Sequence, residues 1–155
     1  MINARKTGGF AAGTRLFCGD GLTSIEKIKV GDRVLTRDAG IARVTAISKK
    51  TIRTRLVHFH PYSMGETGPA INLFLPPDQM VLIRDWRARE AFGVDRALVE
   101  AKSLVDDIFI RMTEPREQVL FQVSFASPHI LYLEGIEVGS ADAITARGQF
   151  LHPAQ

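Results

Sequence analysis

Short runs of β-branched and aromatic residues, broken every few positions by Gly, Pro or Asp, limit most strongly how this chain can fold. Runs of about four to eight such residues between turn formers are typical of β-strands, whereas a helix needs a longer apolar stripe. The runs occupy residues 14–18, 33–37, 41–48, 52–59, 71–75, 80–84, 106–112, 119–125 and 129–134. Many short strands in close succession predict an all-β fold.

Two segments depart from the strand pattern, and one strand shows it with particular clarity. Residues 25–29 and 98–104 are each predicted to form a turn or two of helix. In the segment 119–125 apolar residues alternate with other residues, as on a strand with one buried face. This alternation predicts one face with Val119, Phe121, Val123 and Phe125, and an opposite face with Gln122 and Ser124.

Length, charge and cysteine content exclude several classes of protein. With 155 residues, of which 45% are apolar, the chain can bury the core of one domain, and we expect a monomer. The net charge is +3, but the basic residues form no patch with interleaved aromatic side chains, so no nucleic-acid partner is expected. No apolar stretch approaches the roughly eighteen residues of a membrane span, so no membrane partner is expected. Cys18 stands alone, which excludes an internal disulfide and leaves the compartment open.

The segment from Gly8 to Asp38, GGFAAGTRLFCGDGLTSIEKIKVGDRVLTRD, contains an ordered series of turn and strand residues. The series consists of Phe10, Gly13, Thr14, Gly21, Glu26, Gly31, Asp32, Val34 and Thr36. It resembles the first block of the Hint family, the module shared by hedgehog autoprocessing domains and inteins. The resemblance is to bacterial Hint domains in particular, which open with Cys-Phe-x-x-Gly-Thr.

Three later segments continue the resemblance: LPPDQMVLI at 75–83, FGVDRALVEAKSLVDD at 92–107, and VLFQVSF with HILYLEG at 119–135. The resemblance implies the all-β, pseudo-two-fold horseshoe of Hint domains, which the strand pattern favours independently. We therefore expect a lead-in over residues 1–8, a Hint-like domain over 9–140 and a C-terminal tail over 141–155.

The resemblance also implies a nucleophilic cysteine at the position of Gly9 and a histidine at the position of Gln79. In the family, the cysteine attacks the preceding carbonyl to form a thioester, and the histidine helps to protonate the leaving nitrogen. Glycine has no side chain, and glutamine forms hydrogen bonds but does not titrate near neutral pH. The sequence thus predicts a site that is degenerate at both positions. Restoring both residues is expected to restore cleavage if the strands still hold the bond in the reactive geometry.

Three other residues are candidates for parts of the site. Cys18 lies nine positions after Gly9 and is expected to fill a small apolar space rather than to replace the nucleophile. The resemblance places Thr36 near the former active site. His129 precedes Gly135 by the spacing of the intein closing block, but in the bacterial alignment it stands where a glutamate is usual. A catalytic role and a hydrogen-bonded strand position both remain open for His129.

His58 and His60 form a His-x-His pair that would place both imidazoles on one face of a strand. No third ligand can be named and Arg53 and Arg55 are close in sequence, so no metal is expected, and no cofactor is implied. The C-terminal segment lacks the asparagine that inteins cyclise, since the two asparagines are Asn3 and Asn72.

Two functional readings follow. In the first, which the double loss at Gly9 and Gln79 favours, a degenerate Hint domain is kept as a structural or peptide-binding module. In the second, the chain is an autoproteolytic domain of the active family whose acyl shift is blocked by substitution. The expected partner in both is the flanking polypeptide of its own or a host chain.

Overall fold

The computed structural model describes residues 8–65 and 68–141, and strands make up most of it. The strands are β1 (Phe10–Ala11), β2 (Arg15–Cys18), β3 (Gly21–Ser24), β4 (Arg33–Thr36), β5 (Gly40–Arg43), β6 (Ala46–Thr54), β7 (Val57–Phe59), β8 (Leu73–Leu75), β9 (Met80–Ile83), β10 (Ala97–Glu100), β11 (Ile110–Met112), β12 (Arg116–Ser124), β13 (Ile130–Tyr132) and β14 (Glu137–Gly139). The helices are η2 (Ile25–Lys27), α1 (Trp86–Phe92) and η3 (Ala101–Leu104). The prediction of an all-β fold is confirmed.

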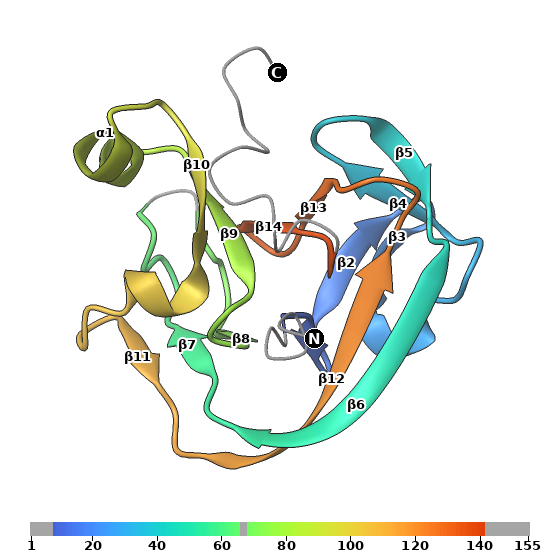
Figure 1. Cartoon of the computed structure of the whole chain (residues 1–155), viewed down its shortest axis with the longest axis horizontal. Coiled ribbons are helices and arrows are strands. Elements are labelled where there is room, and N and C mark those ends of the chain that lie inside the picture. The colour runs from blue at the N-terminus through green and yellow to red at the C-terminus, as the bar shows by residue number, and fades with distance from the viewer. Residues whose placement is uncertain (1–7, 66–67, 142–155) are drawn as a thin grey trace.

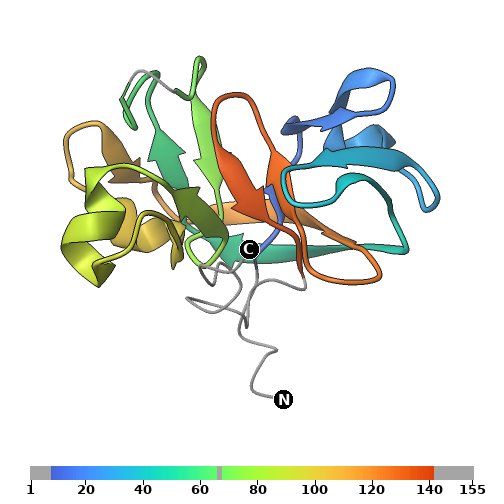
Figure 2. The ribbon, with the colours of Figure 1, turned by 90° about the horizontal axis from the view of Figure 1, so that it is seen from above.

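The strands form a horseshoe with two arms (Figure 1). One arm carries β2 to β5, the other carries β7 to β11 with α1, and the long antiparallel pair β6–β12 joins them. An eight-stranded sheet, in the order β10-β9-β14-β13-β4-β2-β3 with β5 on β4, spans both arms. Seen from above, the β13–β14 hairpin lies between the arms (Figure 2). This is the horseshoe that the sequence predicts.

The β6–β12 pair is a twisted ribbon whose buried side changes along its length. Val119 is 38% exposed, whereas Leu120 is buried against Ala11, and Val123 is buried in the main core. Leu120 and Val123 are an odd number of residues apart, so opposite faces of the strand are buried at these two positions. Two-stranded ribbons twist strongly, which brings this change about. The prediction of one apolar face over 119–125 is therefore wrong for Val119.

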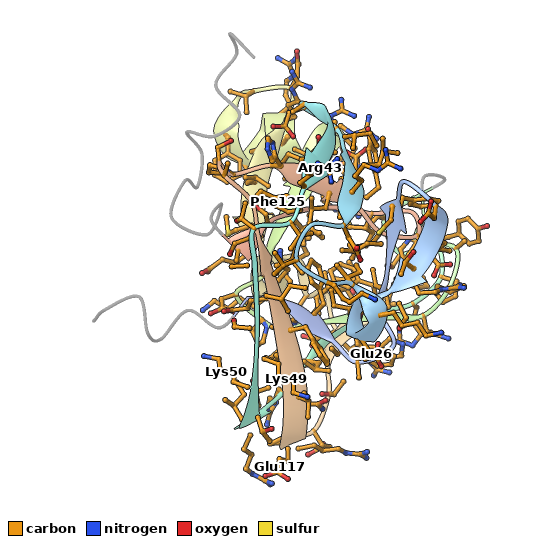
Figure 3. All side chains as sticks on the ribbon, turned by 90° about the vertical axis from the view of Figure 1, so that its right-hand side faces the viewer. Glu26, Arg43, Lys49, Lys50, Glu117 and Phe125 are labelled. Carbon is orange, nitrogen blue, oxygen red and sulfur yellow. The ribbon has the colours of Figure 1, made fainter. Side chains whose placement is uncertain are left out.

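The ribbon carries charged side chains, of which Lys49 and Glu117 are exposed and Lys50 is half-buried (Figure 3). Phe10 is almost fully buried in the main core and β1 pairs with β12, so the chain enters the fold at its centre. The main core also contains side chains from both arms, among them Leu16, Val34, Phe59, Leu75, Val81 and Leu131. Burial of these large apolar side chains is the main stabilising contribution to the fold.

The helical predictions are partly confirmed. η2 lies within the predicted segment 25–29, but the segment 98–104 begins as strand β10 and turns into η3 only at Ala101. Helix α1 was not predicted, because Ala88 is its one buried residue and its sequence carries no apolar stripe. Asp85 caps its start by accepting from the N–H of Arg87, and Gly93 ends it in the left-handed conformation.

Most of the predicted lead-in and tail, residues 1–7 and 142–155, lies outside the described residues. Within the described part of the chain, no helix has the length and apolar character needed to cross a membrane.

Candidate functional site

Gln79 is held rigidly at the start of β9. The turn before it begins with Pro76 and Pro77, which fix their backbone angles. The N–H of Gln79 donates to the carbonyl of Pro76 (3.1 Å), and its carbonyl accepts from the N–H of Ala101 (2.9 Å). Its side chain is 1% exposed. The backbone N–H and carbonyl of Gln79 are thus both hydrogen-bonded, one within the turn and one to η3. The side chain is buried in the centre of the fold.

The side-chain amide of Gln79 joins the two ends of the described chain. Its Oε1 accepts from the N–H of Gly9 (2.6 Å), and its Nε2 donates to the carbonyls of Gly139 (2.8 Å) and Met80 (3.1 Å). One donor and two acceptors surround it, so the orientation of the amide follows from its partners. Gly9 and Gln79 therefore meet, as the resemblance predicts. Removing Gln79 would leave three buried backbone groups without this partner.

Two further side chains hold the backbone of Gly8, one at its N–H and one at its carbonyl. The N–H of Gly8 donates to Oδ1 of Asp78 (2.7 Å), and the carbonyl of Gly8 accepts from Nε2 of Gln122 (3.3 Å). The Gly8–Gly9 peptide bond is thus held at its oxygen by Gln122 and at its nitrogen by Gln79. We call Gly8 and Gly9 with these three side chains the central site.

The backbone at Gly9 leaves no room for a side chain. Its φ angle is +115°, a conformation that L-residues rarely adopt. A β-carbon on Gly9 would lie 2.7 Å from the carbonyl oxygen of Phe121 and 3.1 Å from Cγ of Gln122. The first contact is with backbone in the β6–β12 ribbon, which cannot rotate away as a side chain can. A cysteine at position 9 therefore requires a shift of the backbone, a condition that the sequence does not reveal.

Thr36 and His129 lie in the neighbouring strands rather than on the Gly8–Gly9 bond. The hydroxyl of Thr36 accepts from the N–H of Ala39 (3.0 Å) and donates to the carbonyl of Gly40 (2.7 Å), which closes the β4–β5 turn. Thr36 also pairs with Leu131 of β13. Its hydroxyl is thus engaged within its own hairpin.

Asp38 holds the side chain of His129, which is 13% exposed, through Nδ1 (2.9 Å). Because a carboxylate accepts, Nδ1 carries the proton. The carbonyl of His129 accepts from the N–H of Ser140 (2.9 Å), the residue after Gly139. The N–H of His129 also donates to the hydroxyl of Ser140 (3.1 Å), so His129 is linked to Gln79 through Ser140 and Gly139.

Cys18 lies on β2, where it pairs with Gly21 and Val34 and packs against the main core, in the small apolar role that was expected. Burial raises the pKa of the Cys18 thiol above its ordinary value, and the nearby carboxylates of Asp32 and Asp20 raise it further. A hydrogen bond with Thr23 opposes this shift. The thiol is thus less ionised at neutral pH than a free cysteine, and a thiol is a weaker nucleophile than its thiolate.

His58 and His60, the histidine pair, stack on one face of β7 and its extension, with ring centroids 4.0 Å apart. Nε2 of His58 lies 2.9 Å from the side-chain oxygen of Asn72, and Nδ1 of His60 lies 2.9 Å from the carbonyl oxygen of Phe109. Among the described residues, no group of three or more His, Cys, Asp or Glu side chains could hold a metal ion. The absence of a metal at the histidine pair stays a prediction.

The sequence analysis did not identify Asp78 and Gln122 as site residues. Asp78 directly precedes Gln79, and that adjacency was a usable signal, because both side chains follow the same turn. Gln122 faces away from Phe121 and Val123 on a strand, but alternation alone does not say which polar residue faces the centre. Gln122 reaches Gly8 because β1 pairs with β12, across 114 positions of sequence.

Comparison with known proteins gives a consistent picture. A family model described as Hint domain matches residues 8–143. A bacterial intein-like domain from Clostridium thermocellum is 19% identical, with a TM-score of 0.57 over 85% of this chain and 98% of that one. A DnaB intein from Synechocystis sp. PCC 6803 is 11% identical, with a TM-score of 0.54 over 87% and 99%. The gp41-1 intein is 15% identical, with a TM-score of 0.52 over 85% and 98%. These structural likenesses show the fold. No curated protein matches the sequence.

Proposed function

The chain belongs to the Hint domain family, and from this we propose that it is a Hint domain that does not cleave itself. On this proposal, the domain serves as a structural or peptide-binding module for the polypeptide attached to it. One observation carries the proposal: the Gly8–Gly9 peptide bond is held at both of its polar atoms, yet Gly9 offers no nucleophile.

The chemistry of the acyl shift explains why this observation matters. The first step forms a bond from a side-chain sulfur or oxygen to the preceding carbonyl carbon, and the peptide nitrogen leaves with a proton. Glycine at position 9 supplies no such atom. Gln79 accepts a hydrogen bond from the nitrogen, and its amide is not an acid that could protonate this nitrogen as it leaves. General acid assistance is commonly worth about 10²–10⁴ in rate. The step therefore lacks both the nucleophile that attacks the carbonyl carbon and the acid that protonates the leaving nitrogen.

The alternative is an autoproteolytic domain of the active family that substitution at position 9 has blocked. The hydrogen bonds to the Gly8–Gly9 bond favour this alternative in part, since a donor at the carbonyl oxygen is what developing negative charge requires. The carbonyl of Phe121 argues against it, because a cysteine at position 9 has no room in this backbone. If the chain had recently lost only the thiol, the space that a cysteine side chain needs at position 9 would still be present. We therefore favour the module without cleavage.

A fusion experiment tests the proposal. A carrier protein is joined to the N-terminus of the full chain, and the product is followed by gel and mass spectrometry for a day. Parallel samples receive dithiothreitol, which attacks thioesters, or hydroxylamine, which also attacks esters formed by Ser or Thr. We expect the intact mass in every sample. Release of the carrier at the Gly8–Gly9 bond would overturn the proposal.

A further inference from the structure

The central site contacts its own chain in a way that identifies what it binds. Three side chains contact two successive backbone residues: Asp78 accepts from the N–H of Gly8, Gln79 accepts from the N–H of Gly9, and Gln122 donates to the carbonyl of Gly8. All three partners on the bound segment are backbone atoms. Such contacts fix the position and direction of an extended segment, but they do not by themselves distinguish one residue type from another.

Selectivity arises from the space around Gly9. The carbonyl oxygen of Phe121 would lie 2.7 Å from a β-carbon at position 9, closer than real β-carbons approach. The positive φ angle adds a second preference for glycine. Gly21 separates the two effects, since its φ is +113° but a β-carbon there would meet no described atom within 4 Å. Position 9 thus excludes a side chain by contact, whereas position 21 disfavours one through backbone conformation alone.

The residues after Gly9 complete the contact with the ribbon. Phe10 is 1% exposed and pairs with Phe121, and Ala11 pairs with Leu120. β1 is therefore a short edge strand added to β12, with one large apolar side chain in the main core. Strand addition supplies backbone hydrogen bonds, and a buried aromatic side chain supplies apolar contact. The bound segment thus has the form glycine followed by a large apolar residue.

We infer that the central site is a glycine-selective clamp for an extended polypeptide segment, and that its occupant is residues 8–11 of the chain itself. Asp78, Gln79 and Gln122 hold the backbone of the segment. The carbonyl of Phe121 imposes the glycine at position 9. This inference rests on the proposed function, because cleavage at the Gly8–Gly9 bond would release Gly8, which supplies the contacts with Asp78 and Gln122.

Hydrogen exchange on the full chain, carried as the same N-terminal fusion, tests the clamp. The readout is the exchange rate of the residue 9 amide in the native state, measured by NMR or by mass spectrometry of N-terminal peptides. Gln122→Leu removes the donor to Gly8, and we expect exchange about fivefold faster, the equivalent of one hydrogen bond. Ser48→Ala is its control, because Ser48 contacts Gln122 but not the bound segment. The control should leave the rate unchanged.

A second pair of variants, Gly9→Ala and Gly21→Ala, tests the requirement for glycine at position 9. Gly9→Ala should accelerate exchange at residue 9 about tenfold or more, since the added β-carbon overpacks against Phe121. Gly21→Ala carries the same conformational cost in open space and should leave exchange at residue 9 unchanged. If Gly9→Ala does not fold, the Gln122→Leu measurement decides alone.

The outcomes separate the clamp from the proposed function. The clamp would be overturned if exchange at residue 9 were unchanged in Gln122→Leu and no faster in Gly9→Ala than in Gly21→Ala. If the carrier stays attached in that case, the proposed function still stands. Release of the carrier would overturn the proposed function whatever the exchange rates are. Faster exchange in both test variants, with both controls unchanged and the carrier attached, is the result that supports the clamp.

Discussion

The residue types alone would favour the histidine pair over the central site as a functional site. The contacts of the two regions favour the central site instead. The histidine pair contains two side chains that can bind metal and transfer protons, yet each imidazole has its recorded hydrogen bond to a nearby oxygen, from Asn72 or from the carbonyl of Phe109. The central site contains glycines, amides and one carboxylate. Its contacts nevertheless connect segments 70 and 114 positions apart in the sequence.

This difference teaches that convergence of distant segments marks a built site better than reactive residue types do. In the central site Gly8, Gly9 and Gln79 are buried, and the site is fixed by the turn before β9, by β12 and by the end of β14. The histidine pair lies at the surface, in an open cavity that Arg55 and Arg111 also line. The variants below test the contrast, from the largest expected effect to the smallest.

Gly9→Cys, alone or with Gln79→His, should destabilise the fold most. The β-carbon would overpack against the carbonyl of Phe121 and would hold an L-residue at positive φ, so we expect about 2–4 kcal/mol less free energy of unfolding. Urea denaturation measures this loss. We also expect no thiol-dependent release of a fused carrier, because the backbone that must accept the sulfur has no space for it.

Gly21→Cys is the control for this prediction, since it introduces the same side chain at nearly the same φ angle into open space. Gly21→Cys should cost clearly less than Gly9→Cys. Thiol-dependent cleavage by the double variant Gly9→Cys with Gln79→His would contradict the prediction. It would show that the backbone can move and that only the chemistry had been lost.

Gln79→Ala should destabilise the protein by about 1–3 kcal/mol, because it leaves the N–H of Gly9 and two backbone carbonyls without their buried partner. Gln118→Ala, a half-buried glutamine on β12, is the matched control and should cost under about 1 kcal/mol. Chemical denaturation of both variants gives the comparison. Equal losses would mean that the central site contributes no more than an ordinary strand position.

His60→Ala should change the free energy of unfolding by less than about 1 kcal/mol, because this surface side chain has one recorded hydrogen bond and one stacking contact. The protein purified with zinc should contain less than one equivalent of metal. Metal analysis before and after the substitution checks both statements. Stoichiometric zinc that disappears in His60→Ala would make the histidine pair a metal site and reverse the contrast.

Glu26, an exposed residue of η2 that belongs to neither region, provides the smallest expected effect (Figure 3). Its pKa is lowered by a hydrogen bond from Ser24 and by another from the N–H of Gly13. A carboxyl group with a lowered folded pKa stabilises the protein above its unfolded pKa, near 4.5, and this contribution is lost as pH falls through the folded value.

Glu26→Gln should therefore lower the free energy of unfolding by no more than about 0.5 kcal/mol at pH 7, since solvent screens exposed charges. The difference from the native protein should vanish at low pH, below the folded pKa of Glu26. Ser24→Ala removes the hydrogen bond that is the larger cause of the lowered pKa of Glu26. It should therefore reduce the pH dependence of the free energy of unfolding. Denaturation across pH 3–7 measures it, and a difference that persists unchanged at low pH would contradict the assignment.

The sequence allowed several parts of the fold and site to be predicted. Most strands and the turn before β9 have local signals, namely alternation and proline, whereas β1, β3, β10 and β14 lie outside the predicted runs. Helix α1 has capping residues at Asp85 and Gly93 but no apolar stripe, because Ala88 is its one buried residue. The meeting of Gly9 with Gln79 was predicted by family resemblance, whereas Asp78 and Gln122 had no motif to identify them.

The sequence by itself determined the all-β class, the family resemblance and the absence of a nucleophile at Gly9, because each follows from residue types and their spacing along the chain. Only the tertiary structure decided that Gly9 must be glycine. The reason is the carbonyl oxygen of Phe121, which reaches position 9 through the pairing of β1 with β12. Every residue has such a carbonyl, so its position depends on strand register and twist and leaves no mark in the amino-acid sequence.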